Sequence, residues 1–560
     1  MFEEEIKKLL KKEVKEEIAL EVPPDTKLGD YAFPCFTLAK TLKKNPVQIA
    51  KEIASKLKPT KNIAKITATG PYVNFFVNKG NQAENVLIDI NYKKEKYGSS
   101  DEGKEKIISL DFSSPNIAKP FGIGHLRSTV IGNSLSLMHE HLGYKIVRLN
   151  HLGDWGTQFG ALIYSYLTWG DRTNLKADPI HHLYDLYTKF NAKKEKDDKL
   201  QAVAREWFKK LEDGDKEATK LWAEFRHLSI HAFNKVYEKL GISFDANNGE
   251  AFFNDKIESA ISLAEKKGIT ELNDGALIVP LADVPVPAML RKSDKASTYL
   301  ARDLAALLYR IKEYKSKGIV YVVGSEQKLH FEQLFAVARK LGVKEDLNHV
   351  NFGMYLSTDG KKMSTRKGKL IFMEEVLEDV IDLAKKTIDE KNPELKNKDK
   401  VAQQIGVGAV VFGDLVNDRI RDITFDWEKI LDLEGDTGPY LQYTYARASS
   451  IIRKAKEQKL KVGVKVNFEM LLQPVEQQVV SLLAEFPEKV KHSLNEYKPH
   501  ILAQHLLATA RHFNEFYHSC PCLKEENEEL KMARLLLIDC TRSVIKTGLH
   551  LLGIESPEEM

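Results

Sequence analysis

Two β-type segments joined by a glycine-containing loop and a helix constrain the fold of this chain more than any other feature. Residues 107–112 (IISLDF) have the composition of a short strand. After the loop at 113–125, apolar residues recur at helical spacing until Gly143 offers an end for the helix; they are Leu126, Val130, Leu135, Met138 and Leu142. Residues 144–150 (YKIVRLN) supply the second strand. A strand–helix–strand unit predicts a parallel sheet, because parallel neighbours need such a crossover.

The other segments divide the chain into three expected domains. Residues 1–100 begin with an amphipathic helix and continue into β-type segments, which predicts a small α+β domain. Residues 101–400 are expected to form an α/β domain with a charged, helical insertion near 170–265. Further β-type segments of this domain are expected in its sheet; they are 276–282, 318–324 and 351–356. Residues 401–560 read as helical throughout, so the predicted fold class is multidomain α/β, with a Rossmann-type parallel sheet and an all-α C-terminal domain.

Composition sets broad limits on the class of protein. A chain of 560 residues is too long for one core, and its net charge of +4 neither requires nor excludes a polyanionic partner. Neither a long apolar run nor an apolar N-terminal region is present, so we expect no membrane span, no targeting peptide and a cytoplasmic location. The four cysteines are too few for a disulfide framework and form no CxxC pair, which argues against a metal site.

The loop at 113–125 leaves the carboxyl end of the first strand, where open parallel sheets bind their ligands. Gly122 and Gly124 remove side chains where a nucleotide would approach the backbone, and the N-terminus of the following helix favours anions. His125 is placed to donate to a phosphate oxygen. Taken alone, the same residues are better explained by a glycine-rich turn with a capping histidine.

A second segment, DGKKMSTRKGK at 359–369, holds five basic residues and one acidic residue. A cationic loop of this kind can close over a triphosphate and stabilise the charge that develops on departing pyrophosphate. A solvated run of charge is the structural alternative for an isolated cluster of this composition.

Together the two segments resemble the HIGH and KMSKS signatures of class I aminoacyl-tRNA synthetases. Four longer stretches resemble arginyl-tRNA synthetase in particular: 111–133 (DFSSPNIAKPFGIGHLRSTVIGN), 150–160 (NHLGDWGTQFG), 298–304 (TYLARDL) and 436–447 (DTGPYLQYTYAR). The N-terminal LGDYAFPCFTLAK is similar to the additional tRNA-contacting domain of that family, and the last 27 residues are similar to its helical anticodon-binding domain. Two positions depart from the signatures, with Gly122 in place of the first HIGH histidine and Thr365 in place of the second KMSKS lysine.

The resemblance implies that the chain attaches L-arginine to tRNA(Arg) through an arginyl-adenylate. Its partners would be L-arginine, tRNA(Arg) and ATP with Mg²⁺ as a substrate, with no tightly bound cofactor, no metal site and no membrane. A monomer is expected. The alternatives are another class I synthetase, or a non-catalytic tRNA-binding paralogue in which Gly122 marks decay.

The same resemblance implies an arginine site at Ser114, Pro115, Asn116, His125, Tyr299, Asp303 and Gln327. Tyr299 and Asp303 are four residues apart and would share a helix face. A carboxylate suits a guanidinium, which carries five N–H donors and a permanent charge. Each residue also has a structural reading, such as an ion pair for Asp303 or a core position for Tyr299. Glu250 is a further candidate acceptor.

The remaining implied residues belong to the nucleotide and the tRNA. The ATP site would comprise Gly122, Gly124, His125, Lys362, Met363 and Ser364, and the catalytic residues would be His125, Lys362 and Arg366. The tRNA-binding residues would be Tyr440, Gln442, Tyr443 and Arg447. Aromatic side chains can stack on unpaired bases of an RNA loop, whereas a buried helix with aromatic core residues would show the same pattern.

Overall fold

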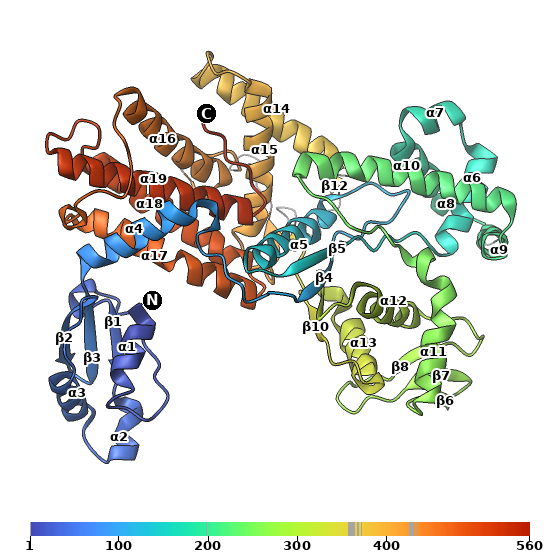
Figure 1. Ribbon diagram of the computed structural model, residues 1–560. Helices are drawn as coiled ribbons and strands as arrows, with labels where there is room; N and C mark the ends of the chain where they lie inside the picture. The colour runs from blue at the N-terminus through green and yellow to red at the C-terminus, as the bar shows by residue number, and fades with distance from the viewer. Residues whose placement is uncertain are drawn as a thin grey trace. The chain divides into compact units, whose positions relative to one another are not determined.

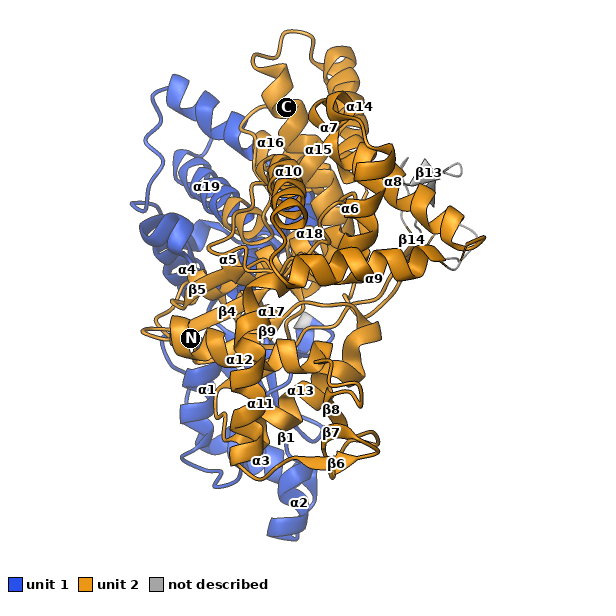
Figure 2. Cartoon of the chain, turned by 90° about the vertical axis from the view of Figure 1, so that its right-hand side faces the viewer, with its two compact units in different colours: residues 1–97, 448–486, 508–545 blue, residues 98–447, 487–507, 546–560 orange. Residues whose placement is uncertain are grey.

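The computed structural model describes residues 2–197, 199–356, 372–424, 430–433 and 435–560, and only the backbone of 365–366 and 369–370. The chain forms two compact units, one of residues 1–97, 448–486 and 508–545 and the other of residues 98–447, 487–507 and 546–560 (Figure 2). The chain passes between the units after Tyr97 and within four helices, which are α16 (Gly438–Glu457), α17 (Pro474–Asn495), α18 (Pro499–Ser519) and α19 (Glu528–Leu551). The domain boundaries expected near residues 100 and 400 remain predictions.

The first unit begins with an antiparallel sheet of three strands in the order β1–β3–β2 (Figure 1). The strands are β1 (Tyr31–Pro34), β2 (Ile63–Thr69) and β3 (Tyr72–Val77), and the helices are α1 (Phe2–Leu10), α2 (Phe36–Leu42), α3 (Pro46–Lys56) and α4 (Lys79–Lys93). Phe2, Ile6 and Leu10 of α1 are buried in one core with Phe33 and Phe75 of the sheet. The predicted amphipathic first helix and the α+β character of this region are therefore confirmed.

The second unit contains a parallel sheet in the order β10–β9–β4–β5. Its elements are β4 (Ile107–Asp111), α5 (Ile123–His141), β5 (Lys145–Leu149), β9 (Gly318–Tyr321), α13 (Lys328–Leu341) and β10 (Asp346–His349). The crossovers from β4 to β5 and from β9 to β10 run in opposite directions. Because crossovers are right-handed, α5 and α13 cover opposite faces, and a crevice opens at the carboxyl ends of β4 and β9. The predicted parallel sheet is confirmed.

Two predicted strands lie outside this sheet. β7 (Ala276–Val279) pairs antiparallel with β6 (Glu271–Asn273) and β8 (Ala288–Arg291), and β11 (Tyr355–Leu356) pairs with β14 (Ile423–Thr424). The expectation that both belong to the parallel sheet is wrong, because a short apolar run does not reveal which partner it will pair with. Conversely, β10 was not predicted; its sequence DLNH has no apolar alternation and forms a strand by pairing with β9.

Helices account for most of the remaining described chain. They are α6 (Thr157–Trp169), α7 (Arg172–Ala177), α8 (Pro179–Lys194), α9 (Lys199–Glu212), α10 (Lys216–Leu240), α11 (Ile257–Lys266), α12 (Tyr299–Tyr314), α14 (Met373–Lys391) and α15 (Lys398–Leu415). The predicted helical insertion corresponds to α7 through α11, and the described part of 401–560 consists of helices and connecting loops apart from β14. The two-residue strands β12 (Thr365–Arg366) and β13 (Lys369–Leu370) form a separate pair.

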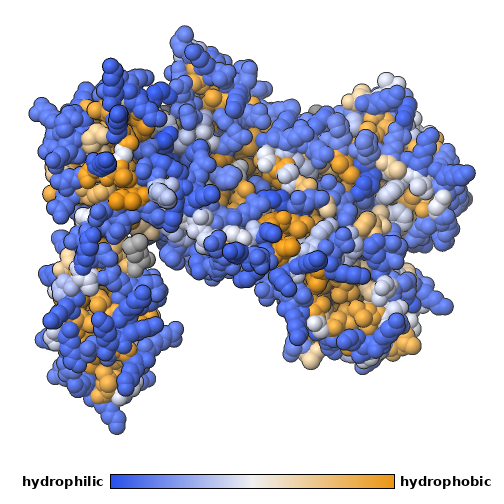
Figure 3. All heavy atoms as spheres, viewed as in Figure 1, coloured by the Kyte–Doolittle hydropathy of each residue, from blue (hydrophilic) through white to orange (hydrophobic). Residues whose placement is uncertain are grey.

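Hydrophilic residues cover most of the face in Figure 3. Among the described residues, no helix combines the length and the apolar character needed to span a bilayer. All four cysteines are buried as free thiols.

Candidate active site at the carboxyl end of the parallel sheet

The loop from β4 to α5 has an unusual backbone at the point where the sheet opens. Ser113 and Ser114 have φ values of 72° and 49°, in the left-handed region that non-glycine residues rarely occupy. The surrounding contacts hold this conformation: Ser113 donates its N–H to Ser128 Oγ at 2.8 Å, and Ser114 donates its N–H to Asn150 Oδ1 at 3.2 Å. Backbone strain of this kind is typical of functional sites.

Asn116 lies beside the segment that follows β5. Its backbone forms a parallel bridge with Gly153, and a Cβ atom on Gly153 would lie 2.1 Å from Asn116 Oδ1. Residue 153 therefore has to be glycine if the amide of Asn116 is to keep this position. The amide is half-buried at the mouth of the crevice.

His125 is the third residue of α5 and folds back over the start of the helix. Gly122, the N-cap residue, donates its N–H to His125 Nδ1 at 3.2 Å. Because a backbone amide can only donate, Nδ1 is the accepting nitrogen and the ring hydrogen lies on Nε2. Burial lowers the pKa of His125 to about 4. The ring is thus a neutral donor at physiological pH. The neighbouring Gly124 faces open space, since a Cβ atom there would meet no atom within 4 Å.

A chain of polar contacts runs from the loop into the crevice. Ser114 Oγ donates to Asp111 Oδ1 at 3.1 Å, and Asp111 Oδ2 accepts from Arg310 Nη2 of α12 at 2.8 Å. Arg310 Nη2 also lies 3.2 Å from His151 Nδ1. Since a guanidinium only donates, His151 Nδ1 accepts and its ring hydrogen lies on Nε2. Burial and the charge of Arg310 lower the pKa of His151, which keeps this ring neutral.

Asp303 stands at the other end of this chain of contacts. Its Oδ1 lies 3.9 Å from His151 Nε2, and its Oδ2 accepts from His330 Nε2 at 2.6 Å. Burial would raise the pKa of Asp303, but the hydrogen bond from His330 and nearby positive charges, including Arg310, outweigh burial and lower it. Asp303 is therefore an ionised carboxylate with a loosely contacted oxygen, whereas Asp111 is already paired with Arg310.

Glu250, in the 3₁₀ turn η3 (Glu250–Lys256), adds a second acidic group. Its carboxylate lies 3.8 Å from Arg302 Nη1, and its side chain is only 18% exposed. Burial raises the pKa of Glu250 to about 7, and the acidic neighbours Asp303 and Asp154 add to this against the opposing effect of Arg302. The site therefore holds one firmly ionised carboxylate and one that titrates near neutrality.

The structure brings only some of the predicted residues together. Ser114 and Asp303 belong to one network of contacts, and Asn116 and His125 border the same loop. Tyr299 shares α12 with Asp303, but its side chain is 69% exposed, and Gln327 lies exposed in the turn before α13. The predicted Lys362, Met363 and Ser364 lie outside the described residues, and so does the side chain of Arg366.

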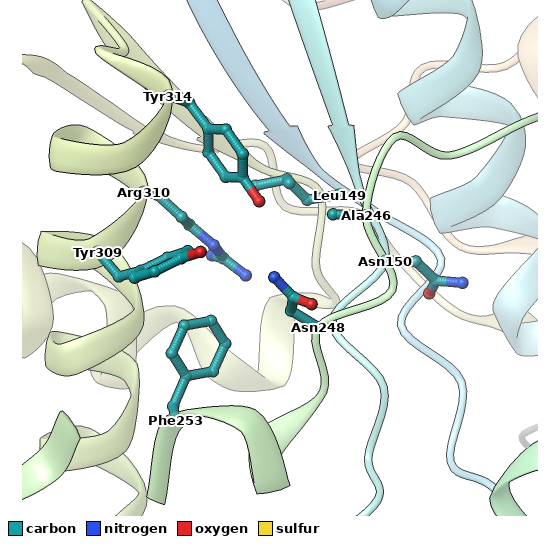
Figure 4. A pocket seen from close by; sticks show the side chains of 8 residues that line it. All are labelled: Leu149, Asn150, Ala246, Asn248, Phe253, Tyr309, Arg310 and Tyr314. Atoms are coloured by element: carbon teal, nitrogen blue, oxygen red, sulfur yellow. The ribbon is translucent and has the colours of Figure 1, made fainter. Parts of the chain in front are cut away.

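A small pocket adjoins the network beyond the end of β5 (Figure 4). It is lined by Leu149, Asn150, Ala246, Asn248, Phe253, Tyr309, Arg310 and Tyr314. The polar ends of Arg310 and Asn248 point toward each other within it. Sequence reasoning missed Asp111, His151, Arg310 and His330. The signal for Asp111 and His151 was their place at the end of a predicted strand, and His151 also lies in the stretch 150–160, whereas Arg310 and His330 had no such signal.

The four predicted tRNA-contacting residues share helix α16 but not its surface. Gln442 is fully buried, and its amide donates to the backbone oxygens of Gln404 and Glu555. Tyr443 and Arg447 are partly exposed, with the guanidinium over the ring at 4.7 Å from its centroid. The half-buried Tyr440 lies one turn before them. Gln442 thus stabilises the helix, and the other three side chains reach its accessible side.

Three family models match successive parts of the chain. They are "Arginyl tRNA synthetase N terminal domain" at residues 1–77, "tRNA synthetases class I (R), catalytic domain" at 86–427 and "DALR anticodon binding domain" at 441–560. The parallel sheet and the crevice at its carboxyl end thus belong to a class I aminoacyl-tRNA synthetase catalytic domain.

Two individual relatives show to which family of class I synthetases the chain belongs. An arginine–tRNA ligase of Clostridioides difficile is 44% identical over 562 residues, covering 100% of this chain and 98% of that protein. Arginine–tRNA ligase 1 of Bacillus cereus is 47% identical over 548 residues, covering 97% and 95%. The chain belongs to the arginyl-tRNA synthetase family. A solved arginyl-tRNA synthetase of Thermus thermophilus has the same fold, with a TM-score of 0.86 and 24% identity over 100% of this chain and 99% of that one.

Proposed function

We propose that this chain attaches L-arginine to tRNA(Arg) at the expense of ATP, through an arginyl-adenylate. The observation that carries the proposal is the ionised Asp303 in the crevice at the end of the sheet, within a family of arginine–tRNA ligases. A partly buried carboxylate with an accessible oxygen matches a guanidinium in charge and in hydrogen bonding. Asp111 is neutralised by Arg310, so Asp303 is the better acceptor of the two.

The other residues divide the substrate between them. Tyr299 would close over the guanidinium from the exposed first turn of α12, and Gln327 would contact the substrate from the turn before α13. Ser114, Pro115 and Asn116 would hold the α-amino group. Glu250, held near Arg302, would add negative charge beside the guanidinium.

His125 would act on the nucleotide side. The neutral ring donates from Nε2, and the N-terminus of α5 adds a positive potential. Both activation and transfer are displacements, so positioning and stabilisation of charge supply the catalysis without an enzyme nucleophile. Magnesium would arrive with ATP as part of the substrate. Lys362, Met363, Ser364 and Arg366 keep their predicted roles toward the triphosphate.

The accessible side of α16 would contact tRNA. Tyr440 and Tyr443 offer rings for base stacking, and Arg447 offers a charge for the phosphate backbone. We further propose a cytoplasmic monomer, in keeping with four free, buried thiols.

Pyrophosphate exchange tests the proposal directly. The full-length protein is incubated with ATP, labelled pyrophosphate and L-arginine, with and without tRNA that carries an arginine anticodon. Exchange that depends on arginine is expected in the presence of tRNA, and exchange supported instead by another amino acid would point to a different synthetase. Absence of exchange under every condition would support the non-catalytic paralogue.

A further inference from the structure

His330 is a side chain of the crevice for which neither the signatures nor the mechanism above provides a role. It lies in the first turn of α13 and places Nε2 2.6 Å from Asp303 Oδ2, on the neighbouring helix α12. The two side chains are 22% and 30% exposed, so the pair borders the crevice and is not part of the core. We propose that His330 is a positioning residue that fixes the Asp303 carboxylate for the guanidinium of arginine, an inference that rests on the proposed function.

The contacts of the carboxylate fix its orientation. His330 uses one lone pair of Oδ2, which leaves Oδ1 and the second lone pair of Oδ2 for a ligand. Oδ1 faces His151 Nε2 at 3.9 Å, beyond hydrogen-bond distance. One edge of the carboxylate is thus held by the protein, and the other edge is available to a planar pair of N–H donors.

The imidazole of His330 is itself held in place. Its ring meets Phe331 edge-on, with centroids 5.4 Å apart, and Phe331 belongs to the buried core cluster beneath α12 and α13. A carboxylate without such a support would sample other rotamers, and ordering it on binding would cost affinity. Held in one rotamer by His330, Asp303 meets the substrate in the geometry that binding requires.

A purely structural role, in which the pair pins α12 to α13, is disfavoured by the packing of these helices. Leu304 and Leu307 of α12 belong to the same buried core cluster as Phe331 and Leu334 of α13. This apolar contact joins the helices without the histidine, and a partly exposed hydrogen bond adds little stability to it. Loss of His330 should therefore affect arginine binding and leave folding intact.

The test compares two substitutions at residue 330. His330→Leu removes the donor at similar size, and His330→Gln retains an N–H near the position of Nε2. In aminoacylation assays with the full chain, His330→Leu should raise KM for arginine about 10- to 100-fold, the value of one charge-assisted hydrogen bond, while KM for ATP stays within about twofold. Binding of agmatine, which has a guanidinium and no carboxylate, should weaken by the same factor when measured as competition with arginine. His330→Gln should restore most of the affinity.

His349→Leu is the matched control. It removes an imidazole that stacks on Phe331, with ring centroids 4.4 Å apart, and that contacts the backbone oxygen of Val323 and not Asp303. The proposal is overturned if His330→Leu leaves KM for arginine unchanged, if KM for arginine and for ATP rise together, or if His349→Leu has the same effect. It is also overturned if His330→Gln is as impaired as His330→Leu. A wild-type protein that does not activate arginine would instead refute the proposed function, so the two failures are distinguishable.

Discussion

Asp303 and Asp414 are two acidic residues of the same unit with opposite surroundings. Asp414 on α15 is 1% exposed, lies 3.1 Å from Arg127 Nε and accepts a hydrogen bond from Tyr355. The Arg127 guanidinium donates further to the backbone oxygens of Gly353 and Arg421, both at 2.9 Å. Asp303, by contrast, is 30% exposed and contacts side chains only, and one of its oxygens is loosely held.

The difference separates an ionic group that joins segments from one that can receive a ligand. Arg127 ties α5, the helix that follows the signature loop, to the backbone just before β11 and just before β14. A buried pair of this kind is costly to break, since the remaining charge has no partner. The Asp303 network keeps a vacant hydrogen-bonding position, at some cost in stability, for a ligand to use.

The largest effect is expected at Arg127. Arg127→Met should lower the free energy of unfolding of this unit by about 3–5 kcal/mol, because Asp414 stays buried without its cation. Urea-induced unfolding followed by circular dichroism measures the loss, and KM for arginine of the folded fraction should be unchanged. The double variant Arg127→Met/Asp414→Leu should recover part of the stability. An unchanged unfolding midpoint together with weaker arginine binding would erase the distinction between the two regions.

Asp303→Asn should show the reverse pattern. Loss of the charge weakens two charge-assisted hydrogen bonds of about 1.5–3 kcal/mol each, so KM for arginine should rise at least about 100-fold. KM for ATP and the urea midpoint should change little. The control is Asp399→Asn, which alters an exposed ion pair with Lys385. Equal losses for arginine and ATP would indicate general damage to the crevice.

The contrast also shows what sequence could and could not predict. The strands β4 and β5, helix α5 and the placement of Ser114 and His125 beyond β4 follow from local periodicity and from two glycines, Gly122 and Gly124. Such patterns involve residues close together in the sequence, so they predict local structure that tertiary packing does not change. The resemblance to arginyl-tRNA synthetases, carried by whole motifs, placed Asp303 on the right helix.

The partners of Asp303 could not be predicted, because they depend on tertiary packing. His330 is 27 residues further along the chain and meets Asp303 only after α13 has packed on α12. Arg310 has the right spacing to face Asp111 only once β4 and β9 are neighbours. Nor does sequence show that Gln442 is buried, since its burial is set by the segments near residues 404 and 555.

The smallest effect on stability is expected at Glu250, and this effect depends on pH. Its carboxyl group ionises near pH 4.5 when unfolded and, because of burial, near pH 7 when folded. Below pH 4.5 the group is protonated in both states, and the stability it contributes is fully present. Between pH 4.5 and 7 the unfolded chain releases the proton first, so this stability is lost as pH rises, by about 1–3 kcal/mol in total.

Glu250→Gln removes this dependence. Relative to wild type, the thermal unfolding midpoint of the variant should rise by a few degrees between pH 5 and pH 8. Saturating L-arginine should shrink the difference, since a nearby guanidinium favours the ionised carboxylate. The exposed Glu258, substituted in the same way, should give a profile parallel to wild type. Parallel profiles for Glu250→Gln and wild type, with or without arginine, would show that burial does not raise the pKa of Glu250 and that arginine does not meet its carboxylate, leaving Asp303 as the acceptor of the site.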